Sequence, residues 1–253
     1  MEIIPITALK DNYIWAIIDS QKKSALVVDP GEAKPVIDFL KQQQLTLVGI
    51  LITHHHWDHT NGITELKEKF NIPVIGSAKE NVSGVTKSVK EPDMIDLNNK
   101  IFYVLDIPGH TLGHIAYYGL NSIFCGDTLF SAGCGRLFEG TPEQMYMTLQ
   151  KMAALPDVTK IYCGHEYTQN NLRFSLTVEP SNQDSIERLK FVNELRSQHL
   201  PTLPSTLKIE KLTNPFLRCD SSELIENVEK FTKKKLSHPI EVFQWLRKWK
   251  DEF

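Results

Sequence analysis

The sequence predicts an α/β fold, in which a layered domain of mixed strands and helices is followed by a smaller α-helical C-terminal domain. Over the first two-thirds of the chain, short β-branched segments alternate with helical patterns. Beyond this region the strand-like segments give way to amphipathic helical patterns. The chain has 253 residues, of which 41% are hydrophobic, so it can bury a substantial core. We therefore expect two domains, at residues 1–170 and 171–253.

The strands expected in the first domain are short and are bounded by turn residues. They cover residues 2–9, 13–19, 25–29, 47–53, 74–76, 101–107, 115–118, 122–125 and 160–163. Residues 47–53 form a nearly continuous apolar run, which predicts a strand buried on both faces. Helices are expected at residues 35–43, where Pro35 suits the first helical position, and at residues 62–70.

Three helices are expected in the second domain. The first follows Asn182, a good N-cap residue, and the second begins near Ser221. The third begins at Pro239, because proline suits the first turn of a helix. A proline-rich connector is expected at residues 200–216, and the domain boundary is expected near residues 169–177.

Composition excludes several classes of protein. The formal net charge of −3 gives no general attraction to nucleic acid or to anionic membranes. No apolar run approaches the roughly 20 residues of a membrane span, and no leader-like segment opens the chain. The four cysteines form no Cys-x-x-Cys pair, so they are interpreted as reduced thiols. We expect a cytoplasmic monomer that acts on a small molecule and binds neither nucleic acid nor membrane.

Five clusters of metal-ligand side chains follow predicted strands. They lie at residues 29–31, 53–59, 108–110, 126–128 and 164–165. Ligand sites gather at strand ends in α/β sheets, because loops there bring distant side chains together. This pattern predicts one metal centre built from several loops.

The first four ligands form a His-x-His-x-Asp-His segment. In an extended loop His54 and His56 can point the same way, whereas Asp58 and His59 point elsewhere, so the segment can serve two ions. The count fits one ion held by His54, His56 and His110, a second held by Asp58, His59 and His165, and Asp127 bridging both. Imidazole and carboxylate ligands suit two divalent ions, with zinc preferred and iron or manganese as alternatives.

Two further histidines lie near these ligands. His55 alternates away from its neighbours, so we expect no ligand role for it. His114 competes with His110 in Gly109-His110-Thr111-Leu112-Gly113-His114, and we favour a packing or supporting role for His114 because it begins the next strand.

The His-x-His-x-Asp-His segment with its later His, Asp and His resembles the metallo-β-lactamase superfamily. The resemblance extends to the hydroxyacylglutathione hydrolases, the glyoxalase II family, and covers essentially the whole chain. It rests on the segments at residues 11–13, 29–31, 109–114, 126–130, 132–136, 139–141, 164–168, 214–218 and 246–253. This resemblance implies a four-layer αβ/βα sandwich followed by an α-helical domain.

The implied activity is hydrolysis of S-D-lactoylglutathione to glutathione and D-lactate, the second step of methylglyoxal detoxification. A hydroxide bound by the two metal ions would attack the thioester carbonyl, and the seven ligand residues carry over one for one. The resemblance assigns glutathione binding to Arg136, Tyr167, Arg247 and Lys250. Phe138 stands where some members have a tyrosine, so one hydroxyl contact with substrate is missing.

Arg247 and Lys250 are three residues apart on one helical face, where they suit the carboxylates of glutathione. Without the resemblance this pair would be interpreted as a solvated helix end, and we expect both side chains near the surface. The main alternative function is a glutathione-persulfide dioxygenase with a single iron, or another hydrolase of the same fold. The second ligand set, Asp58, His59 and His165, argues against the dioxygenase because a single iron does not need it.

Overall fold

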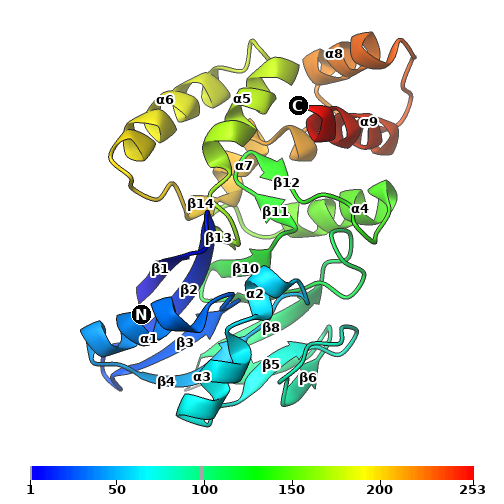
Figure 1. Cartoon of the computed structure of the whole chain (residues 1–253). Helices are drawn as coiled ribbons and strands as arrows, with labels where there is room; N and C mark the ends of the chain where they lie inside the picture. Colours follow the sequence, from blue (N-terminus) through cyan, green and yellow to red (C-terminus); the bar gives the residue numbers. More distant parts are fainter. Residues whose placement is uncertain (1, 97–99) are drawn as a thin grey trace. The chain divides into compact units, whose positions relative to one another are not determined.

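The computed structural model describes residues 2–96 and 100–253, and the chain divides into two compact units (Figure 1). The first unit comprises Met1–Asp106 and Leu112–Gly126, and the second comprises Ile107–Thr111 and Asp127–Phe253. Each unit has buried hydrophobic clusters of its own.

One sheet of the first unit has its strands in sequence order, with antiparallel pairing from β1 to β3 and parallel pairing from β3 to β6. Its strands are β1 (Glu2–Ala8), β2 (Asn12–Asp19), β3 (Ser24–Val28), β4 (Thr46–Leu51), β5 (Val74–Ser77) and β6 (Lys87–Val89). Every residue of β3 is buried, so both faces of this strand are covered.

Helices α1 (Ala33–Gln43) and α3 (Ile63–Phe70) contribute their apolar faces to the first unit's core. Val36 and Leu40 of α1 and Ile63 and Leu66 of α3 join one cluster with alternate residues of the strands. The short helix α2 (Trp57–Thr60) lies between β4 and α3 in the sequence. Pro35 was expected at the first helical position, but α1 begins two residues earlier, at Ala33.

The other strands of the first unit pair antiparallel in the order β10-β9-β8-β7. They are β7 (Met94–Asp96), β8 (Ile101–Asp106), β9 (Ile115–Gly119) and β10 (Ser122–Gly126). The buried hydroxyl of Tyr117 on β9 lies within hydrogen-bonding distance of two carbonyl oxygens, that of Ile52 at 2.7 Å and that of Ile75 at 3.0 Å. These bonds tie β9 to the ends of β4 and β5, so the two sheets pack face to face. Burial raises the pKa of Tyr117 well above its usual value.

The second unit is mainly helical, with short strands near its beginning. Its elements are β11 (Leu129–Phe130), β12 (Gly133–Cys134), α4 (Pro142–Ala153), β13 (Lys160–Cys163), α5 (Thr168–Val178), α6 (Gln183–Ser197), β14 (Ser205–Thr206), α7 (Leu207–Thr213), a 3₁₀ turn (Pro215–Leu217), α8 (Ser222–Thr232) and α9 (Pro239–Glu252). Asn182 caps α6 by accepting from the backbone N–H of Ser185, and Pro239 opens α9, as the sequence predicted.

Three helices of the second unit were not anticipated. Helix α4 carries a full capping box between Thr141 and Gln144, a signal that its sequence offered. Helix α5 runs through residues 169–177, where a domain boundary was expected, and α7 lies within the expected connector. The first residues of α5 are polar, so the sequence pattern did not indicate its apolar face. That face includes the fully buried Leu172 and Phe174.

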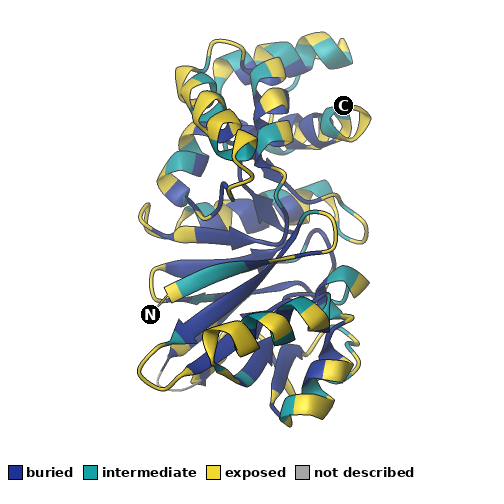
Figure 2. Ribbon diagram, turned by 60° about the vertical axis from the view of Figure 1, so that its left-hand side comes forward, coloured by how far each residue is buried: buried dark blue, intermediate teal, exposed yellow. Residues whose placement is uncertain are grey.

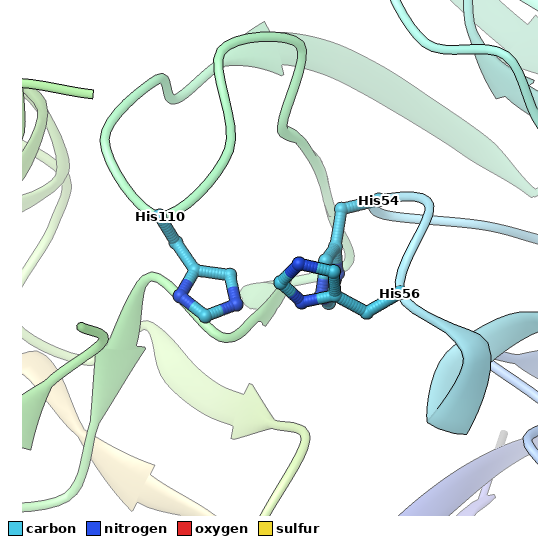
Figure 3. Close-up of side chains that lie close together, drawn as sticks. All are labelled: His54, His56 and His110. Atoms are coloured by element: carbon cyan, nitrogen blue, oxygen red, sulfur yellow. The ribbon is translucent and has the colours of Figure 1, made fainter. Parts of the chain in front are cut away.

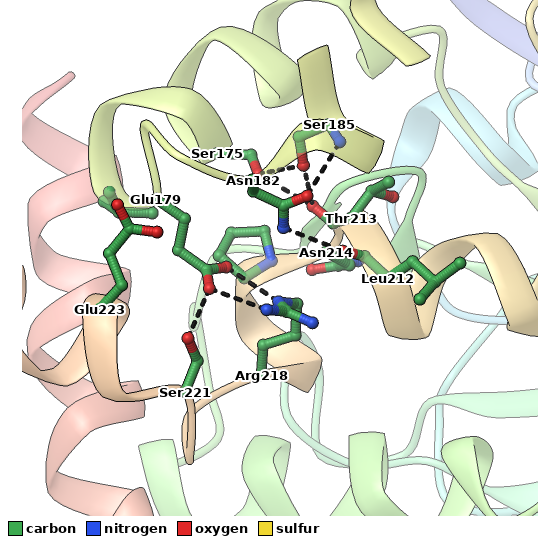
Figure 4. Close-up of polar contacts among 12 residues, drawn as sticks. Ser175, Glu179, Asn182, Ser185, Leu212, Thr213, Asn214, Arg218, Ser221 and Glu223 are labelled. Atoms are coloured by element: carbon green, nitrogen blue, oxygen red, sulfur yellow. Dashed lines mark hydrogen bonds and ion pairs between the residues drawn. The ribbon is translucent and has the colours of Figure 1, made fainter. Parts of the chain in front are cut away.

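A buried ion pair connects the end of α5 to the start of α8 (Figure 4). Glu179, which is 1% exposed, accepts from Arg218 Nε at 2.9 Å and Nη2 at 3.0 Å, and from Ser221 Oγ at 2.6 Å. These hydrogen bonds raise the pKa of Arg218 above its usual value. The buried carboxylate of Glu179 is stable here because it accepts hydrogen bonds from two nitrogens of the Arg218 guanidinium and from the Ser221 hydroxyl.

Aromatic rings fill the space among the C-terminal helices. Trp249 stacks on Phe231 with ring centroids 4.5 Å apart, and Phe216 lies 5.7 Å from Phe243. Figure 2 colours the chain by burial: the strands are mainly buried, and the helices of the second unit have an exposed outer face. Within residues 2–96 and 100–253, the helices are too short or too polar to cross a membrane.

Candidate metal and substrate sites

The loop after β4 presents the first two predicted ligands (Figure 3). His54 is 1% exposed, and its Nε2 atom lies 3.1 Å from Nδ1 of His56. The two rings therefore face the same region, as their spacing of two residues predicted. Figure 3 also draws His110, which is carried by the loop that follows β8.

Asp58 and His59 occupy the short helix α2. The Nε2 atom of His59 lies 3.4 Å from Oδ2 of Asp58, and Asn12 donates to that same oxygen at 3.0 Å. Gly31 permits this arrangement, since a Cβ atom there would lie 1.9 Å from the carbonyl oxygen of Asp58. The motifs around Asn12 and Gly31 thus hold the helix that carries these two ligands.

Asp29 fixes the orientation of the ligand loop. Its buried carboxylate accepts from the backbone N–H of Thr53 at 2.8 Å and from the Thr53 hydroxyl at 2.6 Å. Its Oδ2 atom also lies 3.1 Å from Nδ1 of His59. Because a carboxylate accepts, this contact assigns the proton of His59 to Nδ1 and leaves Nε2 as the ligand atom. Sequence reasoning placed Asp29 at a strand end but gave it no role.

The two remaining histidines near the ligand loop contact other groups. His114 stacks on His54 with ring centroids 4.5 Å apart and an interplanar angle of 14°, and its Nδ1 lies 3.1 Å from the carbonyl oxygen of Ile115. This contact agrees with the packing role that was favoured for it. Nδ1 of His55 lies 3.3 Å from a carboxylate oxygen of Glu80.

The second unit brings the remaining three predicted ligands together. Oδ2 of Asp127 lies 3.2 Å from Nε2 of His165 and 3.6 Å from Nε2 of His110. Nδ1 of His110 donates to the carbonyl oxygen of Arg136 at 2.8 Å, so its Nε2 is the ligand atom. One carboxylate oxygen thus lies beside two imidazoles that were assigned to different ions.

These donor sets fit divalent metal ions. In the first unit, ring nitrogens of His54 and His59 lie within 4.8 Å of each other and of the carboxylate of Asp29, which holds Nδ1 of His59. Imidazole nitrogen and carboxylate oxygen suit zinc, iron and manganese. All four cysteines are free and buried, and burial raises the pKa of the Cys134 thiol to about 11, so this thiol stays protonated at neutral pH.

A cavity of about 380 Å³ lies in the second unit. Its lining includes all four predicted substrate residues and two of the predicted metal ligands: Arg136, Tyr167, Arg247, Lys250, His110 and Asp127. Tyr167 stacks on His165 with centroids 4.7 Å apart and rings within 5° of parallel. Three basic residues, Arg136, Arg247 and Lys250, form one wall of this cavity, called the basic wall below. The same cavity is lined by the predicted ligands His110 and Asp127.

The position of Arg247 corrects one expectation. The sequence placed this side chain near the surface, but it is only 5% exposed, because its helix packs it inward beside Phe243 and Leu246. Nη1 of Arg247 donates to the carbonyl oxygen of Cys134 at 2.7 Å, and its guanidinium lies 5.0 Å from the centre of the Phe216 ring. Among the described residues, its buried Nε has no hydrogen-bond partner.

Lys250 lies one helical turn further on and is half-buried. Burial lowers the pKa of Lys250, and the nearby charges of Arg247 and Arg136 lower it further. Phe138 is 64% exposed, and its ring lies edge-on to that of His110 with centroids 5.3 Å apart.

A buried polar network holds the hairpin of β11 and β12, which separates Asp127 from Arg136 in the sequence. The amide of Asn214 donates to the carbonyl oxygens of Phe130 at 3.1 Å and Gly133 at 2.9 Å. The carboxylate of Glu210 accepts from the backbone N–H of Ala132 at 2.7 Å. Asn214 lies 81 residues from Gly133 in the sequence, but its side chain holds the hairpin beside the site residues. The motif that begins at Asn214 therefore supports the site.

Comparison with known proteins identifies the family of the chain. The metallo-beta-lactamase superfamily matches residues 12–165, and the hydroxyacylglutathione hydrolase C-terminus matches residues 166–253. A hydroxyacylglutathione hydrolase of Vibrio campbellii is 50% identical over 254 residues, covering 100% of both chains. One from Nitrosomonas europaea is 47% identical over 256 residues, covering 100% of this chain and 97% of the relative.

Solved structures agree on the fold. ETHE1 from Myxococcus xanthus aligns with a TM-score of 0.68 at 24% identity, covering 99% of this chain and 98% of that one. The chain has the metallo-β-lactamase fold with a helical C-terminal region. It belongs to the hydroxyacylglutathione hydrolase family of the metallo-β-lactamase superfamily.

Proposed function

We propose that this chain hydrolyses S-D-lactoylglutathione and related S-(2-hydroxyacyl)glutathione thioesters to glutathione and the free hydroxy acid, the second step of methylglyoxal detoxification. Water adds across the thioester, the carbon–sulfur bond breaks, and the thiol of glutathione leaves. Full-length relatives at about 50% identity support this reaction. The observation that carries it is the cavity in which a basic wall meets His110 and Asp127.

We propose that two metal ions complete the catalytic site. His54, His56 and His110 would hold the first ion, Asp58, His59 and His165 the second, and Asp127 would serve both. Such a pair lowers the pKa of water from about 15.7 towards neutrality and polarises a carbonyl oxygen. The donors favour zinc, with iron or manganese as alternatives. The contacts of Asp127 with His110 and His165 support the bridging role.

The protein's own groups orient these ligands and the substrate. Asp29 and the carbonyl oxygen of Arg136 hold Nδ1 of His59 and His110, so the opposite ring nitrogens carry the lone pairs. Arg136, Tyr167, Arg247 and Lys250 bind the glutathione moiety. Its carboxylates match the cationic groups of Arg247 and Lys250, which hold the thioester in place while the reaction proceeds.

In this proposal residues 1–170 form the metal-binding catalytic domain, and residues 171–253 form the helical domain that supplies Arg247 and Lys250. The boundary between the two family matches, at residues 165 and 166, supports this division. The buried free thiols are consistent with a reducing compartment, and we propose a cytoplasmic monomer.

A thioesterase assay on the metal-loaded protein tests the function. We expect hydrolysis of S-D-lactoylglutathione, loss of activity after chelation, recovery when zinc is returned, and about two ions per chain by elemental analysis. Absence of hydrolysis, or consumption of oxygen with a glutathione persulfide instead, would refute the assignment. A bound thiolate in the metal's absorption spectrum would contradict the ligand set.

A further inference from the structure

The basic wall of the cavity already holds one carboxylate of the protein itself. Oδ1 of Asp251 accepts from Nη2 of Arg247 at 3.0 Å and lies 3.5 Å from Nε of Arg136. The two arginines come from distant segments: Arg136 follows β12, and Arg247 lies on α9. Both line the cavity.

The charges around this carboxylate are unbalanced. Arg136, Arg247 and Lys250 bring three positive charges to the cavity wall, against the negative charge of Asp251 and that of Asp127, which lines the cavity beside His110. The guanidinium of Arg247 is nearly fully buried, and a buried cation needs an anionic partner. Its Nη1 and Nη2 atoms bond to Cys134 and Asp251, and its buried Nε has no hydrogen-bond partner among the described residues.

The carboxylate itself is held loosely. The side chain of Asp251 is 41% exposed and that of Arg136 is 64% exposed, so the pair between them is a weak surface ion pair. Asp251 also lies in the last turn of α9. An anion that enters the cavity can therefore displace it without disturbing the buried bond from Arg247 to the carbonyl oxygen of Cys134.

We propose that Asp251 is a tethered competitor: its carboxylate occupies the anion position between Arg136 and Arg247, and a carboxylate of the glutathione thioester replaces it on binding. This inference rests on the proposed function. Substrate and product share the same glutathione carboxylates, so Arg136, Arg247 and Lys250 without the carboxylate of Asp251 beside them would bind both tightly. Asp251 weakens both interactions equally and allows glutathione to leave.

Asp251→Asn tests this proposal, because it keeps the shape of the side chain and removes its charge. We expect about a three- to tenfold lower KM for S-D-lactoylglutathione and an equally lower inhibition constant for glutathione. Glu252→Gln is the matched control, since it removes the same charge from the exposed neighbouring residue. It should change neither constant.

Two further measurements separate this role from a structural one. In an Arg136→Gln background the effect of Asp251→Asn should shrink, because the carboxylate then loses one of its two partners. The dimethyl ester of glutathione, which lacks the carboxylates, should inhibit wild type and Asp251→Asn equally. Thermal unfolding of both variants checks that the fold is retained, and Asp251→Ser provides a second neutral side chain.

An unchanged or higher KM in Asp251→Asn, in a folded protein, would overturn the proposal and identify Asp251 as a support for Arg247. Such a result would leave the thioesterase function intact. If wild type does not hydrolyse the glutathione thioester, the function itself fails, and binding of glutathione to both proteins still decides the role of Asp251.

Discussion

Oδ2 of Asp127 lies 3.2 Å from Nε2 of His165, although 38 residues separate them in the sequence. The same oxygen lies 3.6 Å from His110. Asp127 directly follows β10, and His165 follows β13, so strand ends deliver both ligands. A single carboxylate oxygen beside two imidazoles supports the bridging role proposed for Asp127.

Asp127→Ala should remove both ions and the activity. Replacing groups that only support a ligand already costs about 10- to 100-fold, so loss of a shared ligand should reduce kcat/KM by more than about 100-fold. Elemental analysis and the thioesterase assay check this together. Retention of two ions per chain in this variant would exclude the bridging role.

Asp29→Asn should weaken metal binding without removing a ligand. The amide cannot accept from Thr53 and His59 as the carboxylate does, so His59 loses its fixed orientation. We expect about 10- to 100-fold weaker affinity for one ion, measured by competition with a chelator. Asp38→Asn, on the exposed face of α1, is the control and should bind metal like wild type. Equal affinities in the two variants would show that Asp29 has only a structural role.

Arg247→Lys should impair substrate binding although it keeps the charge. The guanidinium of Arg247 donates to the carbonyl oxygen of Cys134 and to the carboxylate of Asp251 at the same time. The compact ammonium group of lysine cannot make both bonds. A charge-assisted bond contributes about 1.5–3 kcal/mol, so kcat/KM should fall roughly 10- to 100-fold, mainly through KM. Lys248→Ala, an exposed change on the same helix, should leave KM unaltered. Normal KM in Arg247→Lys would mean that the guanidinium does not bind substrate.

Lys250 should give KM a dependence on pH. Its pKa is lowered by burial and by Arg247 and Arg136, so it loses its charge at a lower pH than an ordinary lysine with a pKa of 10.5. KM for the glutathione thioester should therefore rise as pH increases towards this lowered pKa. Lys250→Arg stays charged and should abolish the rise. A rise of equal size in both proteins would assign it to another group.

The sequence anticipated the parts of the site that depend on local spacing. His54 and His56 share a loop, and alternation along extended backbone predicts that they point the same way. His110, Asp127 and His165 were predicted as ligands because each follows an apolar strand and ligand sites gather at strand ends, and their side chains lie close together. The predicted strands are present for a related reason, since each is a short apolar run with clear turn signals.

Contacts over long sequence separations could not be anticipated in this way. The bond between Asp29 and His59 spans 30 residues, and nothing in either segment specifies it. Arg247 carries a charge, so periodicity alone placed it in solvent, whereas the packing of α9 buries it. The strands that were missed have only two or three residues, too few for an alternating pattern.

The proposed function combines metal-assisted thioester hydrolysis with binding of the glutathione carboxylates in one chain. The most direct test compares kcat/KM for S-D-lactoylglutathione with that for S-D-lactoyl-N-acetylcysteamine, which has the same acyl group and no carboxylate. Two charge-assisted contacts predict that the glutathione thioester is preferred by about 100-fold or more. Equal kcat/KM values for the two thioesters, or no hydrolysis of either by the metal-loaded protein, would contradict this assignment.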